Sequence, residues 1–241
     1  MKNFSLPLIT VSLFLIFAVF GIEFSESFFH WIFPDLEKPI YTRTSIPLLL
    51  IHHAVIVAIS SFFSILIGVS AGIFVMRPAG HDFLPIIRTL CAIGQTFPPI
   101  AVLGIVVLMI GYGSLPILIA LSIYGLLPIM ENTLAGLAAV PASVKDAGKA
   151  MGYSSLGRLI YIELPIASPV ILAGIRVSII INIGTATIGS MVGAQTLGAP
   201  IIEGLAASNT AYIIQGAVVV GLFAILVDMA LGKIVHYLPR I

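Results

Sequence analysis

Long runs without a charged residue constrain this chain of 241 residues more than any other feature. A helix needs about 20 apolar residues to cross the roughly 30 Å of hydrocarbon in a membrane. The runs 3–22, 44–76 and 89–130 contain no charged residue, and the stretches 168–197 and 212–235 are almost as apolar. All five are long enough to cross a membrane.

The run 89–130 is about twice the length of one span, so it must fold back on itself. Two glycines and a proline interrupt it, at Gly111, Gly113 and Pro116. We therefore expect two helices there, near 84–110 and 115–136, and we expect the second span to begin near His52. The total is six spans.

Composition excludes a water-soluble domain. Hydrophobic residues make up 59% of the chain, charged residues only 9%, and the mean hydropathy is +1.17. The formal net charge is +1 and no basic run occurs, so nucleic acid is not an expected partner. The lone Cys91 can form neither an internal disulfide nor a zinc site, and we expect it to fill space in the packing.

The distribution of lysine and arginine predicts the orientation. With six spans and a cytoplasmic N-terminus, eight of the basic residues lie inside and only Lys38 and Arg43 lie outside. Both termini, including Lys2 and Arg240, are then cytoplasmic. The first apolar run could also be a secretory signal, but it leaves through Phe20-Gly21-Ile22-Glu23 without a small-x-small cleavage site. We interpret it as a retained first helix.

The segment 139–165 is too charged for lipid. It holds five charged residues, each costing about 2.5–3.5 kcal/mol at the centre of a bilayer. Ser143, followed by Asp146, predicts the N-cap of a short helix that ends at Gly152. A second helix is expected from Ser154 or Ser155 to Pro165. The segment therefore predicts two cytoplasmic helices joined by a glycine elbow.

Two motifs in this segment resemble the "EAA" signature of permease subunits of ABC importers. They are Asp146-Ala147-Gly148-Lys149-Ala150-Met151-Gly152 and Ile162-Glu163-Leu164-Pro165. Asp146 replaces the usual Glu, and Gly148 replaces the usual Ala at a cost of about 1 kcal/mol in helix propensity. In that family the first short helix is a coupling helix that docks on the ATPase subunit.

The resemblance implies an all-α integral membrane protein with the six-helix fold of type I ABC importer permeases and cytoplasmic coupling helices. Residues 1–45 would form the first transmembrane helix and an outer loop, and residues 46–241 the permease domain, with a coupling region at 139–165. The implied ATPase-coupling residues are Ser143, Asp146, Ala147, Gly148, Ala150, Gly152, Leu164 and Pro165.

Further motifs are similar to osmoprotectant permeases, which carry glycine betaine, choline, carnitine or proline betaine. These motifs are Gln95-Thr96-Phe97-Pro98-Pro99, Leu127-Pro128-Ile129-Met130-Glu131-Asn132-Thr133 and Gly184-Thr185-Ala186-Thr187. A departure occurs at Ala194-Gln195-Thr196-Leu197-Gly198, where many relatives have a glycine pair, so the solute itself stays open.

The resemblance also implies the partners. No G-x-x-x-x-G-K-[ST] loop occurs, so we expect ATP and Mg to be bound by two separate ABC ATPase subunits, with no cofactor or metal in this chain. A second permease subunit, identical or related, is expected beside an extracytoplasmic solute-binding protein. The expected location is the bacterial inner membrane, with lipid around the spans.

Polar residues inside the spans are candidates for a translocation pathway. Ser178, Asn182 and Thr185 share a helical face with Gly189 and Gly193, which either lines a route or packs on another helix. Gln95 and Thr96 precede a bend expected at Pro98-Pro99. The pathway candidates are Gln95, Thr96, Ser178, Asn182 and Thr185.

Arg176 and Asp228 lie inside apolar segments, where we expect pairing, including with each other, or a role in gating. His52 and His53 are expected at the membrane interface.

The residues alone are also compatible with other functions. An ABC permease for another small solute, such as an amino acid, would have the same features. An ion-coupled carrier usually buries acidic residues in the membrane, and here only Asp228 qualifies. A membrane enzyme is disfavoured, because no span carries a paired-carboxylate, Ser-His or His-x-x-x-His arrangement and no catalytic residue is predicted.

Overall fold

The computed structural model of the protein describes residues 5–237, and this part of the chain is helical with no strands. The expected start of the first span at Asn3 and the terminal charges Lys2 and Arg240 lie outside the described residues. The membrane-spanning part comprises α1 (Ser5–Gly21), α3 (Ile46–Val75), α4 (Leu84–Thr96), α5 (Pro99–Ile110), α6 (Ser114–Tyr124), α7 (Leu126–Ala138), α10 (Leu164–Ala186) and α12 (Thr210–Tyr237). Shorter helices connect them: α2 (Glu26–Ile32), α8 (Ala142–Ala150), α9 (Ser155–Arg158) and α11 (Gly198–Ala206).

Four helical stretches are long and apolar enough to cross a membrane: Ile46–Val75, Ser114–Ala138, Ser155–Val192 and Thr210–Val235. Two bent pairs, α1 with α2 and α4 with α5, bring the number to six. The prediction of an all-α bundle is therefore confirmed, and the predicted six spans are reached if each bent pair is one span.

The second span begins earlier than expected. α3 starts at Ile46, not near His52, because Pro47 occupies its first turn, where a fixed φ favours a helix and no N–H is needed. Its 30 residues exceed the length of one perpendicular span.

The third span is broken and not merely bent. α4 and α5 meet at 96°, because Phe97 and Pro98 both adopt extended backbone angles. A residue before a proline is driven out of the helical region, and two consecutive prolines extend this effect over two residues. The expectation of one helix over 84–110 was wrong in this respect.

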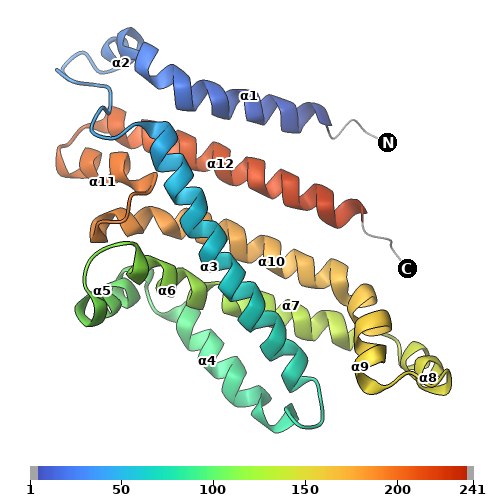
Figure 1. The fold of residues 1–241 in the computed structure, drawn as a ribbon. Helices are drawn as coiled ribbons and strands as arrows, with labels where there is room; N and C mark the ends of the chain where they lie inside the picture. Colours follow the sequence, from blue (N-terminus) through green and yellow to red (C-terminus); the bar gives the residue numbers. More distant parts are fainter. Residues whose placement is uncertain (1–4, 238–241) are drawn as a thin grey trace.

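The helices form a bundle whose two ends differ (Figure 1). α2 and α11 lie at one end, and α8 and α9 project from the other, where the described ends of α1 and α12 also lie. α3 packs on α6, α7 and α10, and α1 packs along α12. Buried apolar side chains fill the space between these helices, among them Leu49, Leu121 and Ile183.

Candidate functional site

The coupling region (residues 139–165) forms the two short helices that the sequence predicts, but the first helix begins differently. Pro141 is the N-cap of α8, and no side chain caps it. Ser143 lies exposed within the first turn, so the predicted Ser143 cap is wrong. Pro141 precludes it, because the carbonyl of Pro141 already accepts the N–H groups of Val144 and Lys145. α9 begins as expected, with the Ser154 hydroxyl accepting the N–H of Gly157 at 3.1 Å.

The elbow between the helices is a Schellman motif centred on Gly152. The Tyr153 N–H donates to the Gly148 carbonyl at 3.1 Å, and the Gly152 N–H donates to the Lys149 carbonyl at 3.0 Å. Gly152 has φ +84°, a conformation that side-chain-bearing residues rarely adopt. No heavy atom lies within 4 Å of the position that a Cβ would take, so backbone conformation and not crowding requires glycine here.

Gly148 allows a close contact with a neighbouring side chain. A Cβ on this residue would lie 2.5 Å from Cδ1 of Ile162, so an alanine would force Ile162 to reorient. At the position where the family pattern usually has Ala, Gly148 thus lets α8 lie close to Ile162 in the next helical stretch. Asp146, Ala147 and Ala150 face away from this contact and are exposed.

The exposed face of the elbow is partly apolar. Three large side chains of this region are exposed. Met151 follows α8 directly, and Leu156 and Tyr161 lie in the helical stretch after the elbow. Apolar side chains on a segment outside the bundle are typical of a protein interface. The elbow therefore has the composition of a docking surface.

Glu163 joins the coupling region to the bundle. Its Oε2 lies 2.7 Å from Nη2 of Arg77, which follows α3, and its Oε1 lies 2.9 Å from Nε of Arg158 on α9. The Glu163 side chain is only 5% exposed. A buried carboxylate shared by two guanidinium groups fixes the position of both segments. Sequence reasoning missed this role, because Arg77 is 86 residues away in the chain.

The expected helix end at Pro165 is wrong. Leu164 and Pro165 begin α10, and the helix runs on without interruption from Ser155. The turn Leu159–Glu163 is π-helical, with the Leu164 N–H donating to the Leu159 carbonyl. This wider turn shifts the carbonyl with which the proline ring would otherwise clash, so the helix can continue. The second helix of the coupling region is thus continuous with the fifth span.

The pathway candidates do not form one site within the chain. Ser178 and Asn182 are fully buried between helices, and the Asn182 amide donates to Ser61 Oγ of α3 at 3.2 Å. Thr185 and Gln95 are half-buried, and Thr96 is exposed. Among the described residues, no hydrogen bond joins Gln95 or Thr96 to the other three. Their role in translocation stays a prediction.

Gly189 and Gly193, which were expected on the same helical face as Ser178, lie after the end of α10. α10 ends at Ala186, and Gly193 follows a 3₁₀ turn with φ +86°. The helical pairing of Gly189 with Gly193 was therefore wrong, since the fixed spacing it requires ends with α10.

His53 lies in the core and not at the interface. It is fully buried, its Nε2 lies 3.1 Å from the Ile183 carbonyl, and its Nδ1 accepts the Leu197 N–H at 3.3 Å. A neutral ring with its proton on Nε2 satisfies both contacts. The interfacial prediction fails for His53, because α3 begins earlier than expected. His52 is half-buried and lines a cavity described below.

The expected pairing of Arg176 with Asp228 is confirmed. Nε and Nη2 of Arg176 donate to the two carboxylate oxygens of Asp228 at 2.6 and 2.5 Å, which joins α10 to α12. A paired arrangement reduces the cost of holding both charges in apolar helices.

We expect Asp228→Leu to destabilise the protein more than the double change Arg176→Leu with Asp228→Leu. The single change leaves an unpaired guanidinium between apolar helices, at a cost of about 2.5–3.5 kcal/mol, whereas the double change removes both charges. Thermal unfolding of the purified variants, followed through the fluorescence of Trp31, measures the difference. Equal midpoints for the single and double variants would show that the pair does not stabilise the bundle.

A bundle of long apolar helices with a charged elbow outside it defines a class of protein, the multi-pass integral membrane proteins. Residues 64–238 match the family described as "Binding-protein-dependent transport system inner membrane component". The chain belongs to this family.

Curated relatives agree with this assignment. The Osmoprotectant import permease protein OsmY of Salmonella typhimurium is 40% identical over 180 residues, which cover 75% of this chain and 76% of OsmY. The Glycine betaine/carnitine/choline transport system permease protein OpuCD of Bacillus subtilis is 36% identical, over 70% of this chain and 74% of that protein.

Solved structures support the fold. A chain of the MetNI methionine ABC transporter in an inward facing conformation superposes with a TM-score of 0.70 and 21% identity, over 83% of this chain and all of that chain. A chain of an amino acid ABC transporter crystallised with histidines gives a TM-score of 0.61 at 16% identity, over 78% of this chain and 89% of that chain. The predicted fold of type I ABC importer permeases is thus confirmed.

Proposed function

We propose that this chain is the permease subunit of an ATP-driven importer that carries a quaternary ammonium osmoprotectant. The observation that carries the proposal is the coupling elbow, an exposed and partly apolar segment outside the bundle whose second helix continues directly into the fifth span. Relatives at 36–40% identity whose names give osmoprotectant or glycine betaine, carnitine and choline transport supply the solute class.

In the proposed assembly, two ABC ATPase subunits bind the elbows of two permease subunits and hold the ATP and Mg. Closure of the ATPases moves each elbow, and the helical stretch from Ser155 to the end of α10 at Ala186 carries that movement into the bundle. An extracytoplasmic binding protein delivers the solute at the opposite end. The elbow and both termini are then cytoplasmic, which agrees with the distribution of basic residues.

ATP dependence of uptake tests the proposal. We expect proteoliposomes that contain the permease, its ATPase and its binding protein to accumulate radiolabelled glycine betaine or choline only when hydrolysable ATP is present. A non-hydrolysable ATP analogue is the control, with sodium and proton gradients kept constant. Uptake that continues without ATP would identify an ion-coupled carrier, and accumulation of amino acids in place of either solute would contradict the solute class.

A further inference from the structure

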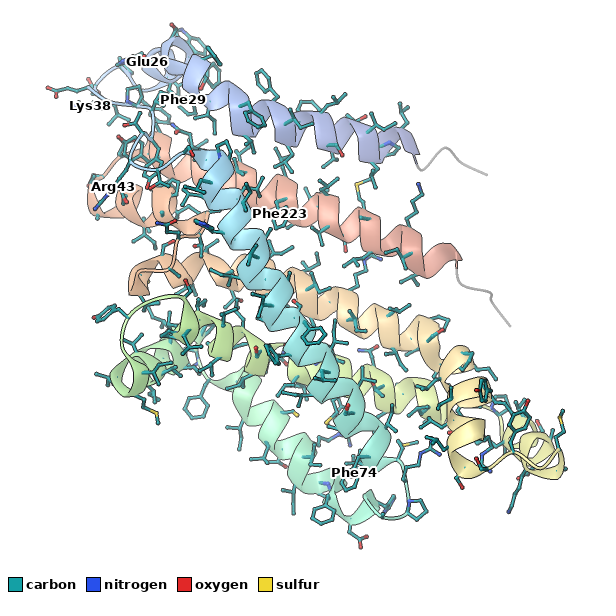
Figure 2. The ribbon with its side chains drawn as sticks, in the orientation of Figure 1. Glu26, Phe29, Lys38, Arg43, Phe74 and Phe223 are labelled. Carbon is teal, nitrogen blue, oxygen red and sulfur yellow. The ribbon has the colours of Figure 1, made fainter. Side chains whose placement is uncertain are left out.

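A cavity of about 390 Å³ opens at the end of the bundle opposite the coupling region. It lies between the loop that precedes α3, the chain that links α10 to α11, and α11 itself. Its volume falls in the range of small-molecule sites, which is about 300–1,000 Å³. The polar side chains that line it are Tyr41, Arg43, Thr44, Ser190, Gln195 and Glu203. Figure 2 shows Arg43 at this end of the molecule, in the loop beside α11.

The cavity contains one negative and one positive side chain, and their pairing is incomplete. Nη1 of Arg43 lies 3.3 Å from Oε1 of Glu203, and the Tyr41 hydroxyl donates to the same oxygen at 3.2 Å. Oε2 of Glu203 accepts no hydrogen bond in the described part of the chain. A carboxylate oxygen is therefore available in the cavity for a cation.

The Arg43–Glu203 pair is weak enough for a ligand to replace. The Arg43 side chain is 76% exposed, and an ion pair in contact with water contributes about 0–1 kcal/mol. Arg43 makes no other ion pair among residues 5–237. A ligand that carries both charges can enter between the two side chains and contact each of them.

Tyr41 lines the cavity and is held in place by its neighbours. The residue is buried, its backbone N–H donates to the Gln215 side chain at 3.1 Å, and its ring meets that of Tyr212 edge to face at 5.4 Å. Burial, followed by the negative charge of Glu203, raises the pKa of Tyr41 to about 12. Its hydroxyl therefore stays protonated at neutral pH and remains a donor to Glu203, which fixes the carboxylate in the cavity.

A second cavity of about 410 Å³ adjoins the first and shares Gly193 and Gln195 with it. It follows α3 past His52 and Ile56 towards the middle of the bundle. Neither an acidic residue nor a lysine or arginine lines it. Of these two adjoining cavities, only the outer one is lined by side chains of acidic residues, lysine or arginine, and the inner cavity continues from it along α3.

We propose that the outer cavity binds a small zwitterion, with the cationic group of the ligand at Glu203 and its carboxylate at Arg43. This inference rests on the proposed function, because it takes quaternary ammonium solutes as the ligands. Glycine betaine has both groups, whereas choline has the cation but lacks the carboxylate. The two side chains should therefore respond differently to the two solutes.

Binding to the permease–ATPase complex without the binding protein tests this inference. Equilibrium dialysis with radiolabelled glycine betaine should show saturable binding to the wild type. We expect Arg43→Gln to weaken glycine betaine binding about tenfold, which corresponds to about 1.4 kcal/mol, and to change choline binding by less than about twofold. Glu203→Gln should weaken the binding of both solutes about tenfold.

Arg88→Gln is the matched control. Arg88 also forms an exposed pair with a glutamate, Glu131, at 2.6 Å, but it lies outside the cavity. We expect unchanged binding of both solutes in this variant. Arg43 is in an exposed loop, so Arg43→Gln keeps the test valid if Glu203→Gln fails to fold.

Absence of saturable binding to the wild-type complex would overturn the inference, as would equal losses of the two solutes in Arg43→Gln or unchanged binding in a folded Glu203→Gln. The proposed function has a separate readout, which is ATP-dependent uptake by the complete system with its binding protein. A complex that transports glycine betaine but binds none in this assay contradicts the outer site alone.

Discussion

Replacing Glu163 by glutamine should uncouple ATP hydrolysis from transport, and uptake should fall by at least about tenfold. The change leaves Arg77 and Arg158, which are 25% and 20% exposed, without their common countercharge. Breaking a buried ion pair by removing one partner costs about 3–5 kcal/mol. Because Arg77 belongs to the α3–α4 connection and Glu163 to the helical stretch that begins with α9, the loss removes an ion pair between the coupling region and the rest of the bundle.

The ratio of solute imported to ATP hydrolysed in proteoliposomes distinguishes this role from simple loss of stability. A destabilised but coupled permease would lower both rates together, whereas the uncoupled variant should hydrolyse ATP with little import. Glu131→Gln is the matched control, because Glu131 pairs with Arg88 at an exposed position. Glu163→Asp keeps the charge and should retain part of the coupling. An unchanged ratio in Glu163→Gln would refute the role.

Replacing Gly152 by valine should abolish solute-stimulated ATP hydrolysis and uptake while leaving membrane insertion intact. Gly152 has φ +84°, and a β-branched residue at such an angle costs about 1–3 kcal/mol in backbone strain. Relief of this strain opens the Schellman motif and turns α8 away from its contact with Ile162. The docking surface then loses its shape, although the bundle, which does not contain Gly152, keeps its packing.

Two further variants distinguish the effect of the backbone conformation at Gly152 from the effect of side-chain size. Gly152→Asn adds a side chain of similar size but tolerates a positive φ, so it should retain most of the activity. Gly111→Val also places a β-branched residue at a positive φ, +86°, in equally open space, at the far end of α5. It should leave copurification of the ATPase subunit unchanged, whereas Gly152→Val should abolish it. Wild-type copurification and hydrolysis in Gly152→Val would disprove the role of the elbow.

The residues that sequence reasoning placed correctly belong to local patterns. Apolar runs indicate spans because a helix of fixed rise must match the thickness of the hydrocarbon. Gly152 marked the elbow because a helix end with a positive φ favours glycine. Arg176 and Asp228 were expected to pair because each alone is costly in an apolar helix.

The errors arose where distant residues or an altered turn changed a local preference. Pro165 should end a helix, but the π-helical turn before it accommodates the ring. Two consecutive prolines turned an expected bend into a break of 96°. His53 was expected at the membrane interface, but in α3 its ring makes hydrogen bonds with the backbone of Ile183 and Leu197. These two residues lie 130 and 144 positions further along the chain.

Hydropathy and turn chemistry therefore determined the apolar membrane segments, the charged elbow outside them and the glycine on which it turns, because these depend on neighbouring residues and on the solvent around them. The tertiary structure decided that Glu163 holds Arg77 and Arg158 together and that Arg43 and Glu203 share one cavity. Each of these sites joins side chains whose separation in space is set by how the helices pack, and no spacing along the chain encodes that distance.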